Sequence, residues 1–194
     1  MVQRTLFLMM TFLFSVTAWS QGQVSGFIHR FGGEVLMTLD SNTGAYYRLA
    51  SSRSETLTTL NKLNTGDFVM ATAVVNSAQN SVQIETIDFV GLRQIIGYWG
   101  TPHRGRVMNF RSYSDLSIYD LIIQSEGDDI RSSRKQMKYT VVPGSGNDWV
   151  MFLSDDRETQ MGYLSLTNSA ATLRLVHSRT GETTNILQLE KLQE

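Results

Sequence analysis

The 194-residue chain contains no cysteine, and this absence removes several kinds of chemistry. Without thiols the protein has no disulfide bond, no thiolate metal site and no cysteine nucleophile. We also expect no lipid anchor of the bacterial lipoprotein kind, because that modification acylates a cysteine just after the signal sequence. Buried apolar surface must therefore stabilise the fold.

Clusters of basic residues are also missing. Seventeen lysines and arginines against 18 aspartates and glutamates give a formal net charge of −1 at pH 7. Affinity for nucleic acid depends on clustered Lys and Arg side chains that release counterions from phosphates. We therefore expect no nucleic-acid partner.

Only the N-terminus carries a long apolar stretch. Leu6 to Val16 is almost unbroken, follows Arg4, and precedes the small residues Ala18 and Ser20, which is the pattern of a secretory signal peptide. The run is about half of the roughly 20 residues that a membrane-spanning helix needs. We expect residues 1–20 to be removed on export, with no stable membrane insertion. The expected location is the periplasm, with secretion as the alternative.

The first half of the mature chain shows three β-prone segments, a helical segment and two more β-prone segments. Leu57, Leu60 and Leu63 recur every three residues, which favours a short helix that Ser54 can cap. Gly and Asn clusters supply the turns between the other segments. The expected strands are 26–31, 34–39, 45–50, 68–75 and 81–90, with the helix at 54–63.

This order of elements resembles the OB-fold. The heptapeptide Leu63-Asn64-Thr65-Gly66-Asp67-Phe68-Val69 looks like the Leu-x-x-Gly-Asp-x-Val entry to strand four of bacterial OB domains. The resemblance implies a five-stranded Greek-key barrel that binds oligonucleotides, oligosaccharides or peptides. We expect protein contacts through Tyr46, Tyr47 and Arg48. The candidate face consists of Phe27, His29, Tyr46, Tyr47 and Arg48.

The second half shows about eight short β-prone segments separated by turn signals. Gly97-Tyr98-Trp99 at its start is similar to the Gly-x-Trp that begins the first strand of lipocalins, where the indole plugs one end of the barrel. The resemblance implies an antiparallel barrel, whose interior at about eight strands can be filled by side chains. The expected strands include Tyr98 and cover 106–111, 115–122, 137–142, 149–154, 160–166, 171–178 and 183–192.

The connection between the halves indicates close packing. Phe89 to Gly100 contains no proline, no serine and little charge, unlike a flexible linker. We place the boundary near Leu92, which gives an OB-like domain at 21–92 and a lipocalin-like domain at 93–194. The envelope-stress outer-membrane lipoproteins linked to copper resistance join these two architectures. This chain differs from them in the order of the halves and in lacking both the lipid-attachment cysteine and Cys-x-x-Cys, so the resemblance implies only an envelope accessory module.

Signatures of catalysis and metal binding are missing from the sequence. Asp40 and Asn42 are typical of the start of a calcium loop, but Ser51 stands where the closing glutamate is required. Gly144-Ser145-Gly146 is interpreted as a turn, because no nucleophile elbow is present. We expect no enzymatic activity, no cofactor and no metal site. The remaining candidates are three isolated histidines (His29, His103 and His177) and two acidic turns (Glu126, Asp128 and Asp129; Asp155, Asp156 and Glu158).

Together these patterns predict an exported, non-catalytic binding or scaffold module of the bacterial cell envelope that recognises another envelope component, such as a protein. The alternative is a carrier of a small apolar ligand in the second barrel. His177 alternates with Arg174 and Val176, so we expect it in the interior beside Leu175. The candidate ligand contacts are Trp99, Trp149, Leu175 and His177.

Overall fold

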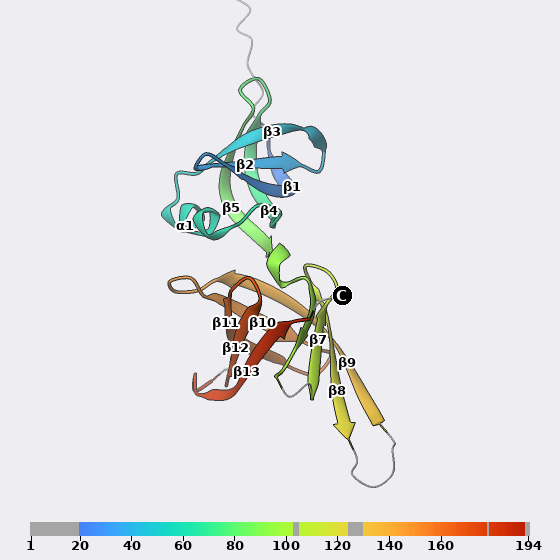
Figure 1. Cartoon of the computed structure of the whole chain (residues 1–194). Helices are drawn as coiled ribbons and strands as arrows, with labels where there is room; N and C mark the ends of the chain where they lie inside the picture. The colour runs from blue at the N-terminus through green and yellow to red at the C-terminus, as the bar shows by residue number, and fades with distance from the viewer. Residues whose placement is uncertain (1–19, 103–104, 124–129, 178, 193–194) are drawn as a thin grey trace, which may run out of the picture.

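A computed structural model describes residues 20–102, 105–123, 130–177 and 179–192. The described residues form an all-β protein, as predicted, with two stacked lobes (Figure 1). The strands are β1 (Ser20–Phe31), β2 (Glu34–Leu39), β3 (Asn42–Ala50), β4 (Phe68–Asn76), β5 (Ser81–Gly91), β6 (Gly97–Gly100), β7 (Arg106–Phe110), β8 (Asp115–Ile123), β9 (Ile130–Pro143), β10 (Trp149–Ser154), β11 (Thr159–Leu166), β12 (Ala170–Val176) and β13 (Thr183–Lys191). The helices are α1 (Ser54–Lys62) and the 3-10 turn η1 (Arg93–Ile95).

The first five strands form a ring of hydrogen-bonded pairs. β1 pairs with β2 and β4, β2 pairs with β3, β5 pairs with β4, and a short parallel ladder joins β3 to β5. The predicted order of three strands, one helix and two strands is confirmed. β1 begins at Ser20 instead of Gly26, because the exposed polar residues Gln21 and Gln23 extend its ladder with β4.

Gly26 lies where β1 changes partner. It faces Leu39 of β2 on one side and Val69 of β4 on the other. A Cβ atom at this position would overlap the carbonyl oxygen of Thr38 and would lie 3.1 Å from the Cα of Leu39. Only glycine permits the backbones to approach so closely.

Arg30 holds α1 against this ring. Its guanidinium donates hydrogen bonds to the carbonyl oxygens of Leu60 at 2.9 Å, Asn61 at 2.8 Å and Leu63 at 2.5 Å. The last carbonyls of a helix have no partner within it, so Arg30 caps the C-terminal end of α1. The predicted cap at Ser54 is wrong, because Ser54 is the first helical residue and Arg53 occupies the N-cap position without a side-chain cap.

Strands β6 to β13 form a closed antiparallel barrel of eight strands, which confirms the lipocalin-like barrel predicted from the sequence. Its interior is filled by large side chains, many of them fully buried. β9 begins at Ile130 instead of Met137, because its first part pairs with β8 as one arm of a long hairpin. The buried interior residues include Trp99, Met108, Phe110, Leu116, Met151, Leu164 and Leu173.

Several contacts pack the two lobes against each other. Val90 of β5 pairs with Val141 of β9. The Nζ atom of Lys62 donates a hydrogen bond of 2.6 Å to the carbonyl oxygen of Gly144 in the second lobe. Tyr113 of the second lobe stacks on Phe68 of the first lobe, with ring centroids 5.6 Å apart. These contacts, together with the buried connector, fit the packed connection that the sequence predicts.

Asp67 joins the first ring to the connector. Only 2% of this residue is exposed, and its carboxylate accepts hydrogen bonds from the amide of Asn64 at 2.7 Å and the amide of Arg93 at 2.8 Å. Burial raises the pKa of Asp67 more than these amides lower it. Two acceptor oxygens are needed here, so an asparagine cannot replace both hydrogen bonds.

The raised pKa of Asp67 predicts a pH-dependent contribution to stability. The folded protein binds this proton more tightly than the unfolded chain, whose pKa is near the ordinary value of 3.8. The contribution is therefore complete below that value and is lost as pH rises through the pKa of the folded state. Asp67→Asn does not titrate at position 67. Subtracting the variant's free energy of unfolding from that of the wild type therefore cancels the pH dependence that comes from the other carboxylates. We expect the difference to shift in favour of the wild type between about pH 7 and about pH 4, measured by urea unfolding. A constant difference would contradict this.

Candidate functional site

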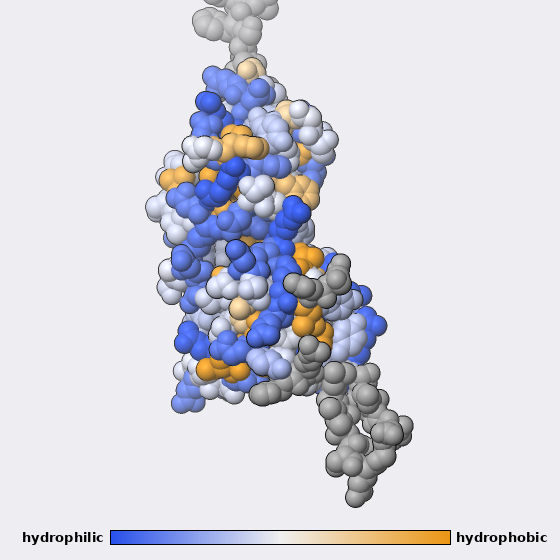
Figure 2. Space-filling view, in the orientation of Figure 1, coloured by the Kyte–Doolittle hydropathy of each residue, from blue (hydrophilic) through white to orange (hydrophobic). Residues whose placement is uncertain are grey.

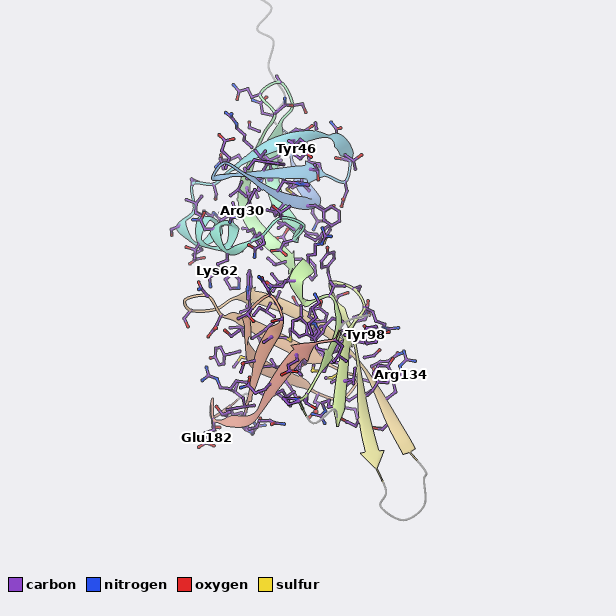
Figure 3. All side chains as sticks on the ribbon, viewed as in Figure 1. Arg30, Tyr46, Lys62, Tyr98, Arg134 and Glu182 are labelled. Atoms are coloured by element: carbon purple, nitrogen blue, oxygen red, sulfur yellow. The ribbon has the colours of Figure 1, made fainter. Side chains whose placement is uncertain are left out.

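Three aromatic rings lie on the outer side of β1 and β3, two of them exposed and His29 half-buried. His29 and Phe31 come from alternate positions of β1, and Tyr46 comes from β3. Their neighbours Ile28 and Tyr47 point inward and are buried, because successive side chains of a strand point to opposite faces. We call His29, Phe31 and Tyr46 the aromatic face. Figure 3 labels Tyr46 on the upper lobe.

The rings of the aromatic face contact one another. His29 and Phe31 are nearly parallel, with centroids 6.5 Å apart. Tyr46 stands almost perpendicular to both, at 5.0 Å from His29 and 5.9 Å from Phe31. Edge-to-face contacts of this kind are favourable, so the rings restrain each other. Phe31 is nevertheless 57% exposed and Tyr46 51% exposed, which leaves their outer surfaces open to a partner.

Polar groups border the aromatic face. The Nε2 atom of His29 lies 3.1 Å from the hydroxyl of Thr38, and Arg48 lies 3.6 Å from the carboxylate of Glu34. Both members of the Arg48–Glu34 pair are mostly exposed, so the pair adds little stability. It does leave the border without net charge.

The structure separates the three residues expected to contact a protein. Tyr46 and Arg48 are exposed. Tyr47 is only 3% exposed, and its hydroxyl accepts a hydrogen bond from the side-chain amide of Asn42, so the prediction that it contacts a partner is wrong. Phe27, which was also expected on the candidate face, contacts Phe68. Phe68 in turn stacks on Tyr113 of the second lobe.

Phe31 was not among the predicted contacts. Its signal was available, because it follows His29 by two positions on the same strand and therefore shares its face.

The two predicted tryptophans belong to the packed end of the second barrel. Trp99 is fully buried, and its indole N–H donates a hydrogen bond of 2.7 Å to the carbonyl oxygen of Ile95. Trp149 is 5% exposed and lies beneath the ammonium group of Lys62, 5.8 Å from its ring centroid. Both indoles therefore close the barrel on the side of the first lobe.

His177 is at the surface, and its predicted interior position is wrong. β12 ends at Val176, where the register with β13 shifts after Leu175. This irregularity interrupts the alternation, so Val176 is buried and His177 is exposed. The Nδ1 atom of His177 faces the amides of the following turn at 3.4 Å.

A small cavity of about 170 Å³ lies in the barrel lumen, and Leu175 lines it. Met108 and Leu153 contribute apolar surface to the cavity wall. Arg106 and Asp120 also line the cavity, and they form an ion pair with 2.5 Å between nitrogen and oxygen. Sites for drug-sized ligands usually have about 300–1,000 Å³, so this cavity is small for a lipid-like ligand. A larger hollow of about 440 Å³ lies at the outer surface beside Tyr98.

The candidate chemical groups are engaged in ordinary surface contacts. Lys135 lies 2.6 Å from the carboxylate of Asp155, and hydrogen bonding to this ammonium holds the pKa of Asp155 well below its usual range. The carboxylate of Asp40 accepts a 2.6 Å hydrogen bond from Ser25. Among the residues that the structure describes, no three His, Asp or Glu side chains could hold a metal ion together. The acidic turn of Glu126, Asp128 and Asp129, the isolated His103, and residues 1–19 of the expected signal peptide lie outside the described residues.

Comparisons with known proteins give no relative: no family model, curated protein or solved structure matches the chain. The resemblance to envelope-stress lipoproteins therefore stays a prediction. Within the described ranges, no helix has the length and apolar character needed to cross a membrane.

Proposed function

We propose that this protein is an exported, non-catalytic binding module of the bacterial cell envelope and that it recognises an envelope protein through the aromatic face. The exposure of Phe31 and Tyr46 carries this proposal, because both rings remain more than half exposed while packed against each other. Aromatic residues are enriched in protein interfaces, where they bury a large area at a small cost in side-chain entropy. The restrained rings lose still less freedom on binding.

The arrangement of the first lobe supports an OB-fold assignment for residues 21–92. The strands close in the order β1-β2-β3-β5-β4, and α1 connects β3 to β4. OB-folds bind extended ligands on an outer face of the barrel. The aromatic face lies on the outer side of β1 and β3, which flank β2 in this order.

The charges around the aromatic face favour a protein over a nucleic acid. Arg48 is partnered by Glu34, and Arg30 is directed to the carbonyls at the end of α1. The positive charge of Arg48 is balanced by Glu34, so this face has little of the net positive charge that nucleic-acid affinity requires. A protein surface with apolar side chains and a few hydrogen-bonding groups matches this face better. The carrier hypothesis has no comparable support, because the lumen cavity is small.

Replacing both Phe31 and Tyr46 with serine tests the proposal. We expect the double variant to recover its partner from periplasmic extract about tenfold less efficiently than the wild type, because the central aromatic contacts of an interface carry most of its affinity. Recovery is measured by quantitative mass spectrometry after chemical cross-linking. Both side chains are exposed, so the free energy of unfolding is expected to change by about 0.5 kcal/mol or less.

Tyr98→Ser is the matched control. Tyr98 is an aromatic residue of similar exposure, at 42%, but it lies on the second lobe (Figure 3). The Tyr98→Ser variant should recover the same proteins as the wild type. Equal recovery with the double variant and the wild type would refute a role for the aromatic face.

A further inference from the structure

Gln21 is expected to become the first residue of the mature chain. The small residues Ala18 and Ser20 end the expected signal peptide, which places the cleavage after Ser20. At an N-terminus the α-nitrogen of glutamine is an amine, and it belongs to the same residue as the side-chain amide carbonyl. Gln23 lacks this combination, because its backbone nitrogen is part of a peptide bond. Export therefore opens a reaction to Gln21 that is closed to glutamines inside the chain.

The fold presents Gln21 at an accessible position on β1. Its backbone pairs with Val74 of β4, and the residue is exposed. Its side-chain Nε2 donates a hydrogen bond of 2.7 Å to the carboxylate of Glu85 on β5. Because β4 lies between β1 and β5 and neighbouring strands are about 4.8 Å apart, this hydrogen bond requires both side chains to be extended. Figure 2 shows a mostly hydrophilic surface at this upper end of the first lobe.

We propose, on the basis of the export included in the proposed function, that Gln21 is a modification site at which the mature chain closes its N-terminus as a pyroglutamyl residue. The neutral α-amine attacks Cδ of its own side chain, so that a bond forms between the α-nitrogen and Cδ and the bond between Cδ and Nε2 breaks. A proton passes from the α-nitrogen to Nε2, and ammonia leaves. A free α-amino group titrates near about pH 8, so part of the amine is neutral at neutral pH. Both reacting groups belong to one residue, so a rotation of the side chain replaces a collision and no second reactant is needed.

The ladder between β1 and β4 is compatible with the closed ring. The ring contains only the α-nitrogen, Cα and the side-chain carbons of Gln21, so the carbonyl group and the residues after it keep their positions. Ring closure removes the positive charge of the terminal ammonium. It also removes the free α-amine that aminopeptidases recognise. Because β1 pairs with β4 from this end as far as Phe27, the closed ring protects the ladder from being shortened.

Glu85 restrains the closure of the ring. Closure requires Cδ to fold back onto the α-nitrogen, which breaks the hydrogen bond between Nε2 and Glu85. An exposed hydrogen bond contributes little, so Glu85→Ala should accelerate closure by about threefold. Asp88→Ala is the matched control, because Asp88 is an acidic residue of the same strand whose carboxylate accepts hydrogen bonds from Thr72 and Thr86 instead of Gln21. Its rate of closure should equal that of the wild type.

The intact mass of the exported protein tests the modification. Protein recovered from the periplasm and incubated at about pH 8 should begin at residue 21, lose about 17 Da as ammonia and become blocked to N-terminal sequencing. The time course of this mass loss gives the rate of closure. Gln21→Leu is the matched control, because leucine has a similar size but no amide, so this variant should keep its full mass and a free amine.

The possible failures give different results in the same experiment. A wild-type chain of residues 21–194 that keeps its full mass and a free amine would overturn the modification and leave export intact. A chain that still contains residues 1–20 would overturn the export on which the proposed function also rests. Equal rates of closure for Glu85→Ala and the wild type would overturn the role of Glu85.

Discussion

Replacing Gly26 with valine is expected to lower the free energy of unfolding by about 3 kcal/mol or more, or to prevent folding of the first lobe. The Cβ atom of any other residue would overlap the carbonyl oxygen of Thr38, which belongs to a hydrogen-bonded strand and cannot move alone. Relief of the clash requires β1 and β2 to separate at the point where β1 also pairs with β4. Urea unfolding followed by circular dichroism measures the loss.

Gly22→Val provides the control for this prediction. Gly22 lies on the same strand, and no atom lies within 4 Å of the position of its Cβ. The same substitution there should change the free energy of unfolding by about 0.5 kcal/mol or less, because valine suits an exposed strand position. If the two variants unfold at the same urea concentration, the close approach at Gly26 does not limit stability.

Element order and alternation could be predicted from the sequence because both depend on neighbouring residues. The turn clusters and the period-two pattern led to strands β2, β7 and β10 with correct or nearly correct bounds. The same alternation explains the errors. A bulge after Leu175 reverses the faces for His177. Tyr46 and Tyr47 do not share one contact surface, because adjacent side chains of a strand point to opposite faces.

Contacts between distant segments could not be predicted in this way. Lys62 donates a hydrogen bond to Gly144, which lies far from it in sequence and in the other lobe. Asp67 formed part of the OB-like motif, yet its partner Arg93 lies in the connector. Such contacts depend on how two folded lobes meet. The aromatic face is intermediate, because only β2 separates its two strands β1 and β3 in the sequence and alternation alone places its side chains on one side.

Replacing Trp99 with alanine is expected to lower the free energy of unfolding by about 3–5 kcal/mol. The indole is fully buried at the end of the second barrel, where the side chains cannot collapse fully into the space it leaves. Trp99→Phe keeps most of the ring volume but leaves the carbonyl oxygen of Ile95 without its donor, so it should cost about 1–3 kcal/mol. The two variants therefore separate packing from hydrogen bonding in the same urea titration.

Tyr98→Ala is the control for the Trp99 series, because the neighbouring side chain is 42% exposed and should contribute little to stability. The result also bears on the carrier hypothesis. A packed barrel depends on Trp99, whereas a barrel whose end opens for an apolar ligand must tolerate its displacement. If Trp99→Ala unfolds within about 1 kcal/mol of the wild type, the indole does not close a packed interior. A carrier that admits ligands at this end would then become the stronger hypothesis.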